Sequence, residues 1–353
     1  MENRPHLRYR IQHNLTDSSK IKGVYVSALG VVVIGRNEGD RLRRCLESFN
    51  PASLPVVYVD SGSTDGSREL AVSRGVEVVA LDLSIPFTAA RARNHGFARL
   101  LEMNPDLIFV QFMDGDCEVA PGWLDSAAAF LEANPTFAVA CGRRRERYPE
   151  KSVYNRLCDI EWETPVGETR SCGGDALMRV QAVKRVGGYD PSVIAAEDDE
   201  ICVRLRQAGW KIQRLDAEMA THDAAITSVR QWWKRSVRTG YAYSLGAYMH
   251  GRPPERHFIR ERRRFWLWGF LLPFAALAAA WPTYGLSLLA FLLYPLQAWR
   301  IYRRTRKTRN VPKRDAMAYG VACIASKIPE FFGFCRFTLT RWRGRRGRII
   351  EYK

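Results

Sequence analysis

The sequence lacks the cysteine and histidine spacings that bind zinc. Its eight cysteines are scattered without a Cys-x-x-Cys pair, and none of its six histidines stands at the spacing of a zinc ligand set. This pattern argues against a zinc site, and unpaired thiols are typical of proteins in a reducing cytosol. An apolar signal segment is also missing, because residues 1–22 are polar and charged. We therefore expect residues 1–27 to form an N-terminal arm.

Acidic residues are scarce in one part of the chain only. The net charge of +17 would by itself suggest a nucleic-acid partner. Residues 260–353, however, contain 20 basic and only 4 acidic residues, which leaves residues 1–259 close to neutral. The charge therefore belongs to a C-terminal region with a separate role, and we expect no nucleic-acid partner.

Charged residues are absent from residues 265–299, and the sequence Trp-Pro-Thr-Tyr-Gly interrupts this run at 281–285. Aromatic residues lie near the ends of the run, and basic clusters flank it at 262–264 and 300–309. The pattern predicts a helical hairpin that dips into the inner membrane and returns, with the catalytic part in the cytosol and membrane lipids as partners. A buried hairpin of a soluble domain is the alternative.

Residues 316–339 are apolar at many positions but also contain charged side chains and a proline, Pro329. We expect an interfacial helix that is broken near this proline, rather than a full membrane span. Arginine, glycine and tryptophan alternate in residues 341–348. This basic tail is predicted to lie on anionic headgroups, and an RNA-binding tail is the competing interpretation.

Apolar runs alternate with helical segments in the first 120 residues. Runs at 31–34, 56–59, 76–81 and 107–113 read as strands, and polar loops or helices follow them. This alternation predicts an α/β fold with a doubly wound, mostly parallel sheet and polar loops along one rim.

Carboxylates follow three of these strands. Glu38 comes after the first run and Asp60 after the second, and Asp114 and Asp116 follow the last run with one glycine between them. A lone Asp-Gly-Asp is more often a turn than a site. Together with helix arginines and glycine-containing loops, these carboxylates instead indicate a nucleoside-diphosphate site with a divalent cation, Mg²⁺ or Mn²⁺.

Six short stretches occur in a characteristic order: V-V-V-I-G-R-N-E, V-D-S-G-S-T-D-G-S, A-A-R-A-R-N-H-G, M-D-G-D, C-G-G-D-A-L-M-R and A-E-D-D-E-I-C-V-R-L-R. Over residues 28–225 the chain resembles family 2 glycosyltransferases of the GT-A fold. The resemblance implies transfer of a sugar from a nucleoside-diphosphate sugar, with inversion at the anomeric carbon. A hydrophobic hairpin after such a domain resembles enzymes that extend lipid-linked saccharides, so a saccharide or lipid-linked acceptor is implied.

The resemblance also implies roles for single residues. The nucleotide would contact Arg36, Glu38, Asp60 and Arg93, and the carboxylate of Asp60 can accept a hydrogen bond from a uracil-type imide, which favours a UDP-type donor. The metal would be held by Asp114, Asp116 and His222. The sugars would lie against Gly173, Gly174 and Asp175, where paired glycines allow a close approach of the backbone.

The general base is predicted at the start of a helix that runs to about residue 208. Asp198 shares a face with the apolar residues 201, 202 and 205, whereas Asp199 and Glu200 are rotated away. The E-D motif of the family points to the same aspartate, with Glu197 as an orienting partner. First-turn acids that only complement the helix dipole are the alternative.

The predicted organisation is a GT-A domain at 28–225, connecting amphipathic helices at 226–259 and a membrane-associated region at 260–353. The segment Gln231–Arg235 departs from the Q-x-x-R-W motif of processive synthases, which favours single transfers. Two other functions stay open at this point: a sugar nucleotidyltransferase with the same nucleotide half, and a non-catalytic membrane scaffold.

Overall fold

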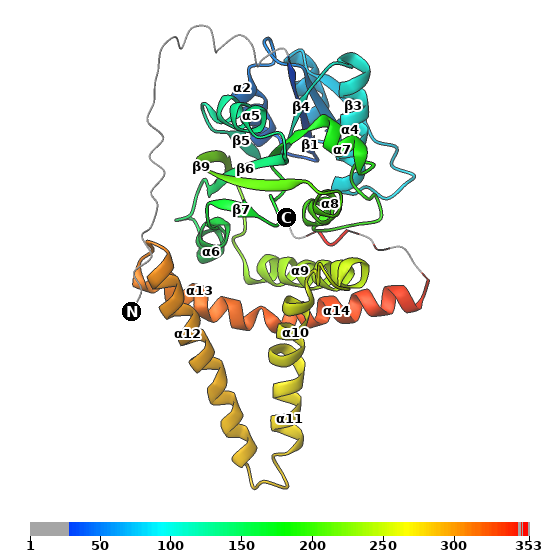
Figure 1. The fold of residues 1–353 in the computed structure, drawn as a ribbon. Coiled ribbons are helices and arrows are strands. Elements are labelled where there is room, and N and C mark those ends of the chain that lie inside the picture. Colours follow the sequence, from blue (N-terminus) through cyan, green and yellow to red (C-terminus); the bar gives the residue numbers. More distant parts are fainter. Residues whose placement is uncertain (1–27, 345–346, 348, 352–353) are drawn as a thin grey trace.

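The computed structural model describes residues 28–344, 347 and 349–351 (Figure 1). The predicted N-terminal arm and part of the basic tail lie outside these residues. A single mixed sheet forms the centre of the α/β part, with the strand order β3-β2-β1-β4-β8-β6-β9-β5 and with β7 paired to β9. Its strands are β1 (Leu29–Gly35), β2 (Val56–Asp60), β3 (Glu77–Ala80), β4 (Phe109–Asp114), β5 (Cys117–Val119), β6 (Phe137–Glu146), β7 (Gly167–Thr169), β8 (Ala176–Arg179) and β9 (Lys211–His222).

The first four strands pair in parallel, as the apolar runs predict, and their registers align the loops that follow them. Gly35 of β1 stands opposite Asp60 of β2, and Ile34 stands opposite Asp114 of β4. The carboxyl ends of three strands therefore meet at one edge of the sheet, which is where open α/β sheets bind ligands. Strands β5, β7 and β8 pair antiparallel, so the sheet is mixed.

Helices cover both faces of this sheet. They are α2 (Asp40–Phe49), α3 (Ser67–Ser73), α4 (Ala89–Met103), α5 (Trp123–Ala133), α6 (Val153–Trp162), α7 (Val180–Arg185) and α8 (Glu197–Gln207). Helix α4 packs closely on the sheet at Gly96. A methyl group there would lie 2.4 Å from Cγ1 of Val32 and 2.8 Å from Cγ2 of Val59, so only glycine permits this approach.

The C-terminal part is helical and lies below the α/β part in Figure 1. Its helices are α9 (Val229–His250), α10 (Ile259–Trp266), α11 (Leu272–Ala278), α12 (Leu293–Thr308), α13 (Lys313–Ala325) and α14 (Lys327–Trp342). Helices α9 and α14 cross at two glycines. A methyl group at Gly240 would lie 2.0 Å from the carbonyl oxygen of Glu330, and one at Gly333 would lie 2.2 Å from that of Val237.

The predicted interfacial helix is corrected in one respect. The break falls at Ser326, between α13 and α14, and not at Pro329. Proline is compatible with the first turn of a helix, where its missing N–H has no intrahelical partner. Pro329 therefore lies in the first turn of α14 without breaking the helix.

Residues 265–299 do form a hairpin, which turns at the predicted 281–285 segment and projects away from the α/β part (Figure 1). The outgoing leg contains α10, a π-helical stretch (Leu267–Leu271) and α11, and the returning leg contains a 3₁₀ stretch (Leu286–Leu292) and α12. Within the described part of the chain, no helix combines the length and the apolar character needed to cross a membrane. The expected transmembrane helix is thus not found, because the apolar run is divided among shorter helical segments.

Candidate functional site

A cavity of about 460 Å³ lies at the edge of the sheet where β1, β2 and β4 end. Its walls include the loop after β1, Ser61 after β2, Phe87, the Asp114–Asp116 loop, and His222 at the end of β9. The register of the parallel strands brings these loops together. Of the residues assigned to a nucleotide and a metal, Arg36, Glu38, Asp114, Asp116 and His222 line this cavity, whereas Asp60 and Arg93 do not.

Arg36 and Glu38 both line this cavity. The guanidinium carbon of Arg36 lies 4.8 Å from the ring centroid of Phe87, and Nη1 of Arg36 lies 2.9 Å from Oε1 of Glu351. Glu38 forms an ion pair of 2.9 Å with Arg41. Phe87 and Glu351 were not foreseen; the second is 315 positions from its partner, and no local pattern connects them.

The environment of Asp60 differs from the nucleotide contact that the sequence predicts. Its buried carboxylate accepts hydrogen bonds from the backbone N–H groups of Gly62 and Ser63, both at 3.1 Å, and from the hydroxyl of Tyr58 at 3.3 Å. These bonds hold the loop after β2, in which Ser61 faces the cavity. A contact between Asp60 and the nucleotide base stays a prediction.

Arg93 joins the two acidic motifs. It is 1 % exposed, and its Nη2 lies 2.8 Å from Oδ1 of Asp114 while its Nη1 lies 2.5 Å from Oε1 of Glu197. We expected a contact with phosphate or base, but both ends of the guanidinium are used by carboxylates. The structure therefore makes Arg93 a positioning residue that connects the Asp-Gly-Asp loop to the start of α8.

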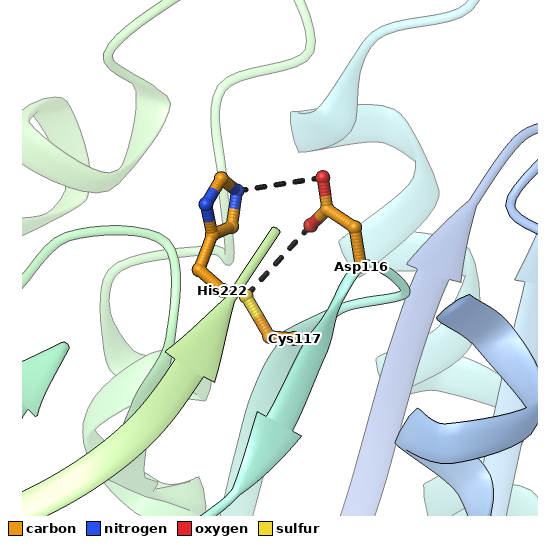
Figure 2. A group of neighbouring side chains, drawn as sticks. All are labelled: Asp116, Cys117 and His222. Atoms are coloured by element: carbon orange, nitrogen blue, oxygen red, sulfur yellow. Dashed lines mark hydrogen bonds and ion pairs between the residues drawn. The ribbon is translucent and has the colours of Figure 1, made fainter. Parts of the chain in front are cut away.

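Asp116 and His222 form the centre of a candidate metal site (Figure 2). Oδ2 of Asp116 lies 3.4 Å from Nε2 of His222, and Cys117 completes a group whose ligand atoms lie within 4.8 Å of one another. The pairing of β5 with β9, which places Cys117 opposite His222, creates this proximity. The carboxylate oxygen of Asp116 suits Mn²⁺ or Mg²⁺, whereas an imidazole nitrogen is a softer donor than Mg²⁺ prefers, so the pair fits Mn²⁺ better.

Asp114 does not belong to the group of possible metal ligands that contains Asp116 and His222, but to a neighbouring group. Its possible partners as ligands are Cys117 and Asp175. Burial and the nearby Asp175 raise the pKa of the Cys117 thiol well above its ordinary value, so sulfur is protonated at neutral pH. Of the three predicted ligands, the structure thus brings Asp116 and His222 together and sets Asp114 beside them.

The Gly173-Gly174-Asp175 segment packs against the Asp114–Asp116 loop. Asp175 is fully buried; it accepts a hydrogen bond of 3.0 Å from the backbone N–H of Asp114 and forms an ion pair of 2.5 Å with Arg144. A methyl group at Gly174 would lie 2.9 Å from Nη2 of Arg93 and 3.0 Å from Oδ2 of Asp114. Glycine is therefore required here because the backbone approaches Arg93 and Asp114 closely, and the expected contact with a sugar stays a prediction.

A second cavity, of about 430 Å³, adjoins the first. Gly173, Gly174 and Asp198 line it, and Arg238 of α9 lines both cavities. Burial, followed by the charge of Glu197, raises the pKa of Asp198 to about 6. The side chain of Asp198 therefore lines this second cavity, and it remains mostly ionised at neutral pH.

The expected orientation of α8 is corrected. Asp199 lines the same cavity as Asp198, and burial together with Asp198 raises its pKa to about 7. Glu200 is only 3 % exposed and accepts hydrogen bonds from Arg204 and His250. Helical spacing misled the prediction because α8 is packed on several sides, so its apolar residues do not mark a single inward face.

Comparisons with known proteins find similarity to glycosyltransferases and to a polysaccharide biosynthesis protein. Residues 30–182 match the model of glycosyl transferase family 2. Succinoglycan biosynthesis protein ExoA of Rhizobium meliloti is 27 % identical over 245 residues, which cover 66 % of this chain and 70 % of that protein. Pre-mycofactocin glycosyltransferase of Mycobacterium tuberculosis is 29 % identical over 60 % of this chain, but the match spans only 45 % of its own length.

A further curated relative and a solved structure are also similar to this chain. N-acetylglucosaminyl-diphospho-decaprenol L-rhamnosyltransferase of M. tuberculosis is 27 % identical over 56 % of this chain and 77 % of that protein. The mannosyltransferase PcManGT from Pyrobaculum calidifontis, solved with GDP-Man and Mn²⁺, superposes with a TM-score of 0.55 at 17 % identity, covering 88 % of this chain and 87 % of that one.

The fold is that of a GT-A-like nucleotide-sugar transferase, and the chain is a glycosyltransferase. Its residues 30–182 are similar to the glycosyl transferase family 2. These findings favour this class over the nucleotidyltransferase and scaffold alternatives.

Proposed function

We propose that the protein transfers a sugar, with inversion, from a nucleoside-diphosphate sugar to a hydroxyl group of a saccharide acceptor. One observation carries the proposal: the cavity with Asp116 and His222 and the cavity with Asp198 meet at a common residue, Arg238. A donor in the first cavity and an acceptor in the second would meet at this junction. The expected hydrogen bond between the carboxylate of Asp60 and a uracil-type imide favours a UDP-type donor.

Asp116 and His222 would hold Mg²⁺ or Mn²⁺, and the ion, when bound, supplies charge neutralisation for the departing diphosphate. The arginines serve two different purposes here. Arg93 keeps Asp114 and Glu197 in place. Arg238 lies between the cavities, where negative charge develops as the bond to the sugar breaks. We therefore assign Arg238 to the leaving group.

Asp198 is the proposed general base. Inverting transfer needs an ionised carboxylate beside the acceptor hydroxyl, and Oδ of Asp198 would accept the proton of that hydroxyl. A pKa of about 6 leaves the group ionised at neutral pH yet basic enough to take the proton. Asp199 shares the cavity, and its higher pKa makes it less ionised under the same conditions.

The acceptor is proposed to be a lipid-linked saccharide used in envelope or exopolysaccharide synthesis, on the cytosolic side of the inner membrane. The names of two relatives, which refer to succinoglycan biosynthesis and to a diphospho-decaprenol acceptor, support this assignment. The hairpin supports it as well, since Trp281 is 93 % and Tyr284 is 98 % exposed at its tip. Such a tip would insert among lipids and bring the site close to the acceptor.

The test compares Asp198→Asn with the matched variant Asp199→Asn, because both residues line one cavity and the change is isosteric. Donor binding is measured by calorimetry, and transfer is measured as release of nucleoside diphosphate in the presence of Mn²⁺. We expect Asp198→Asn to keep donor affinity and to lower transfer by at least about 10²-fold. Near-parental transfer by this variant, or a loss confined to Asp199→Asn, would show that the base has been assigned wrongly.

A further inference from the structure

A third cavity lies at the base of the hairpin, away from the donor and acceptor cavities. It has a volume of about 700 Å³ and forms between the loop that follows α9 and helix α10. Five arginines line it, together with Gly251, Ile259 and Leu267: they are Arg256, Arg260, Arg262, Arg263 and Arg264. Such a density of guanidinium groups around one concave surface is suited to a multiply oxygenated anion.

The charges of these arginines are not neutralised within the described part of the chain. The ion pairs found among those residues include none of the five. Glu255, which precedes them, pairs instead with Arg170 and Arg206, both at 2.6 Å. Glu261 is on the same helix but does not line the cavity. The cavity is therefore cationic, in contrast to the donor cavity, which contains several carboxylates.

One side of the cavity is apolar and continues into the hairpin. Leu267 lines the cavity, and Leu271, Phe274 and Leu277 follow it at helical spacing with 53 %, 57 % and 62 % of their surfaces exposed. An exposed apolar strip thus begins where the arginines end. A ligand that satisfies both parts has a phosphate group attached to hydrocarbon chains.

We propose that this cavity binds the phosphate group of an anionic membrane phospholipid, whose chains lie along the exposed face of α11. The inference rests on the proposed membrane location of the hairpin. The planar guanidinium groups would each donate paired hydrogen bonds to phosphate oxygens. Free inorganic phosphate offers the same oxygens without the chains, so it binds much more weakly.

The test measures cosedimentation of the full chain with vesicles. One set contains phosphatidylcholine alone, and the other contains phosphatidylcholine with phosphatidylglycerol. The variant Arg260→Gln/Arg263→Gln/Arg264→Gln removes three cavity charges. The matched control Arg68→Gln/Lys184→Gln/Arg185→Gln removes the same number of charges from exposed positions on α3 and α7. We expect the cavity variant to lose at least about 10-fold in binding to the phosphatidylglycerol vesicles, and the control to bind like the parent.

A charge-preserving variant, Arg260→Lys/Arg263→Lys/Arg264→Lys, separates a built site from a merely basic surface. We expect it to bind phosphatidylglycerol vesicles several-fold more weakly than the parent, because lysine lacks the planar fork. Equal binding by this variant and the parent would overturn the site, and so would competition by free inorganic phosphate at concentrations near those of the lipid.

The two proposals fail in different ways. If the parent binds both kinds of vesicle equally and the cavity variant does too, the hairpin associates with membranes but the cavity does not select an anionic headgroup. If the parent binds neither kind, the membrane location is wrong and the lipid site is overturned with it. Unchanged thermal unfolding midpoints of the variants show that any loss of binding is local.

Discussion

Arginine has opposite roles in the two halves of the molecule. In the α/β part, Arg93 and Arg144 are buried and paired with carboxylates: Arg93 with Asp114 and Glu197, and Arg144 with Asp175. At the base of the hairpin, the arginines of α10 are paired with no carboxylate of the described residues and face a cavity. The inner arginines hold the acidic residues of the site in position, and the outer ones are available to a ligand.

The difference follows from local charge balance. Residues 1–259 are close to neutral, so an arginine there meets an acid at short range, whereas residues 260–353 have a fivefold excess of basic over acidic residues. A buried arginine without a partner would be costly, but an exposed one remains hydrated until a ligand arrives. The comparison predicts that substitutions in the two regions affect different properties.

The largest effect is expected for Arg93→Met. The change leaves the carboxylates of Asp114 and Glu197 without their shared cation in a buried setting, and breaking such a pair costs about 3–5 kcal/mol. Urea unfolding followed by circular dichroism measures the loss. The matched variant Arg264→Met, at an exposed position, should change the free energy of unfolding by less than about 0.5 kcal/mol. Equal losses would remove the distinction between the two kinds of arginine.

A smaller effect is expected for Gly174→Ala. The added methyl group would press on Arg93 and Asp114, and overpacking of this kind costs about 1–3 kcal/mol. Donor affinity should fall as well, because Asp114 lines the donor cavity. Gly174 is not in the left-handed backbone region, so its added methyl group acts through contacts alone. Gly122→Ala is the reverse case, with backbone strain at φ of 76° and no neighbour within 4 Å of the added carbon. A fully active, fully stable Gly174→Ala protein would contradict the proposed close packing.

The loops after β1, β2 and β4 could be predicted from the sequence because each depends on a local pattern. An apolar run ends, a short polar segment follows, and parallel pairing brings the segments to one edge. The Asp116 and His222 pair followed from the family resemblance, since the two residues are more than one hundred positions apart. These parts of the site required no knowledge of side-chain packing.

Packing decided the parts that could not be predicted. The role of Arg93 depends on two carboxylates that belong to different motifs, and the orientation of Asp199 depends on what surrounds α8. The contact between Arg36 and Glu351 joins opposite ends of the chain. The cavity lined by the five arginines depends on how the loop after α9 folds back on α10. No helical or strand periodicity carries this information.

The pH dependence of transfer tests the buried carboxylates. Burial raises the pKa of Asp198 to about 6, so its base form is lost as the pH falls through that value. We expect kcat/KM to fall about tenfold per pH unit below this pKa. The stability effect has the opposite sign: the raised pKa values of Asp198 and Asp199 favour folding at low pH, and this contribution is lost as the pH rises through about 6 and 7. An acidic limb near pH 4 would contradict the burial of Asp198.

The smallest effect is expected for Glu351→Gln. Its ion pair with Arg36 is exposed, with 58 % and 41 % of the two side chains accessible, and such pairs contribute about 0–1 kcal/mol. Differential scanning calorimetry should show almost no change. The nucleotide affinity should rise slightly, because a carboxylate no longer competes with phosphate beside Arg36. A large loss of stability would mean that this surface pair behaves like the buried ones.

The most direct test of the proposed site is the metal dependence of nucleotide binding. Isothermal titration of the full chain with UDP, and with other nucleoside diphosphates, is compared with and without Mn²⁺, for the parent and for Asp116→Ala. We predict that Mn²⁺ strengthens binding to the parent at least about tenfold and has no such effect on Asp116→Ala, which keeps its fold. If the variant binds nucleotide as tightly as the parent, whether or not Mn²⁺ is present, the metal-assisted donor site proposed for Asp116 and His222 is wrong.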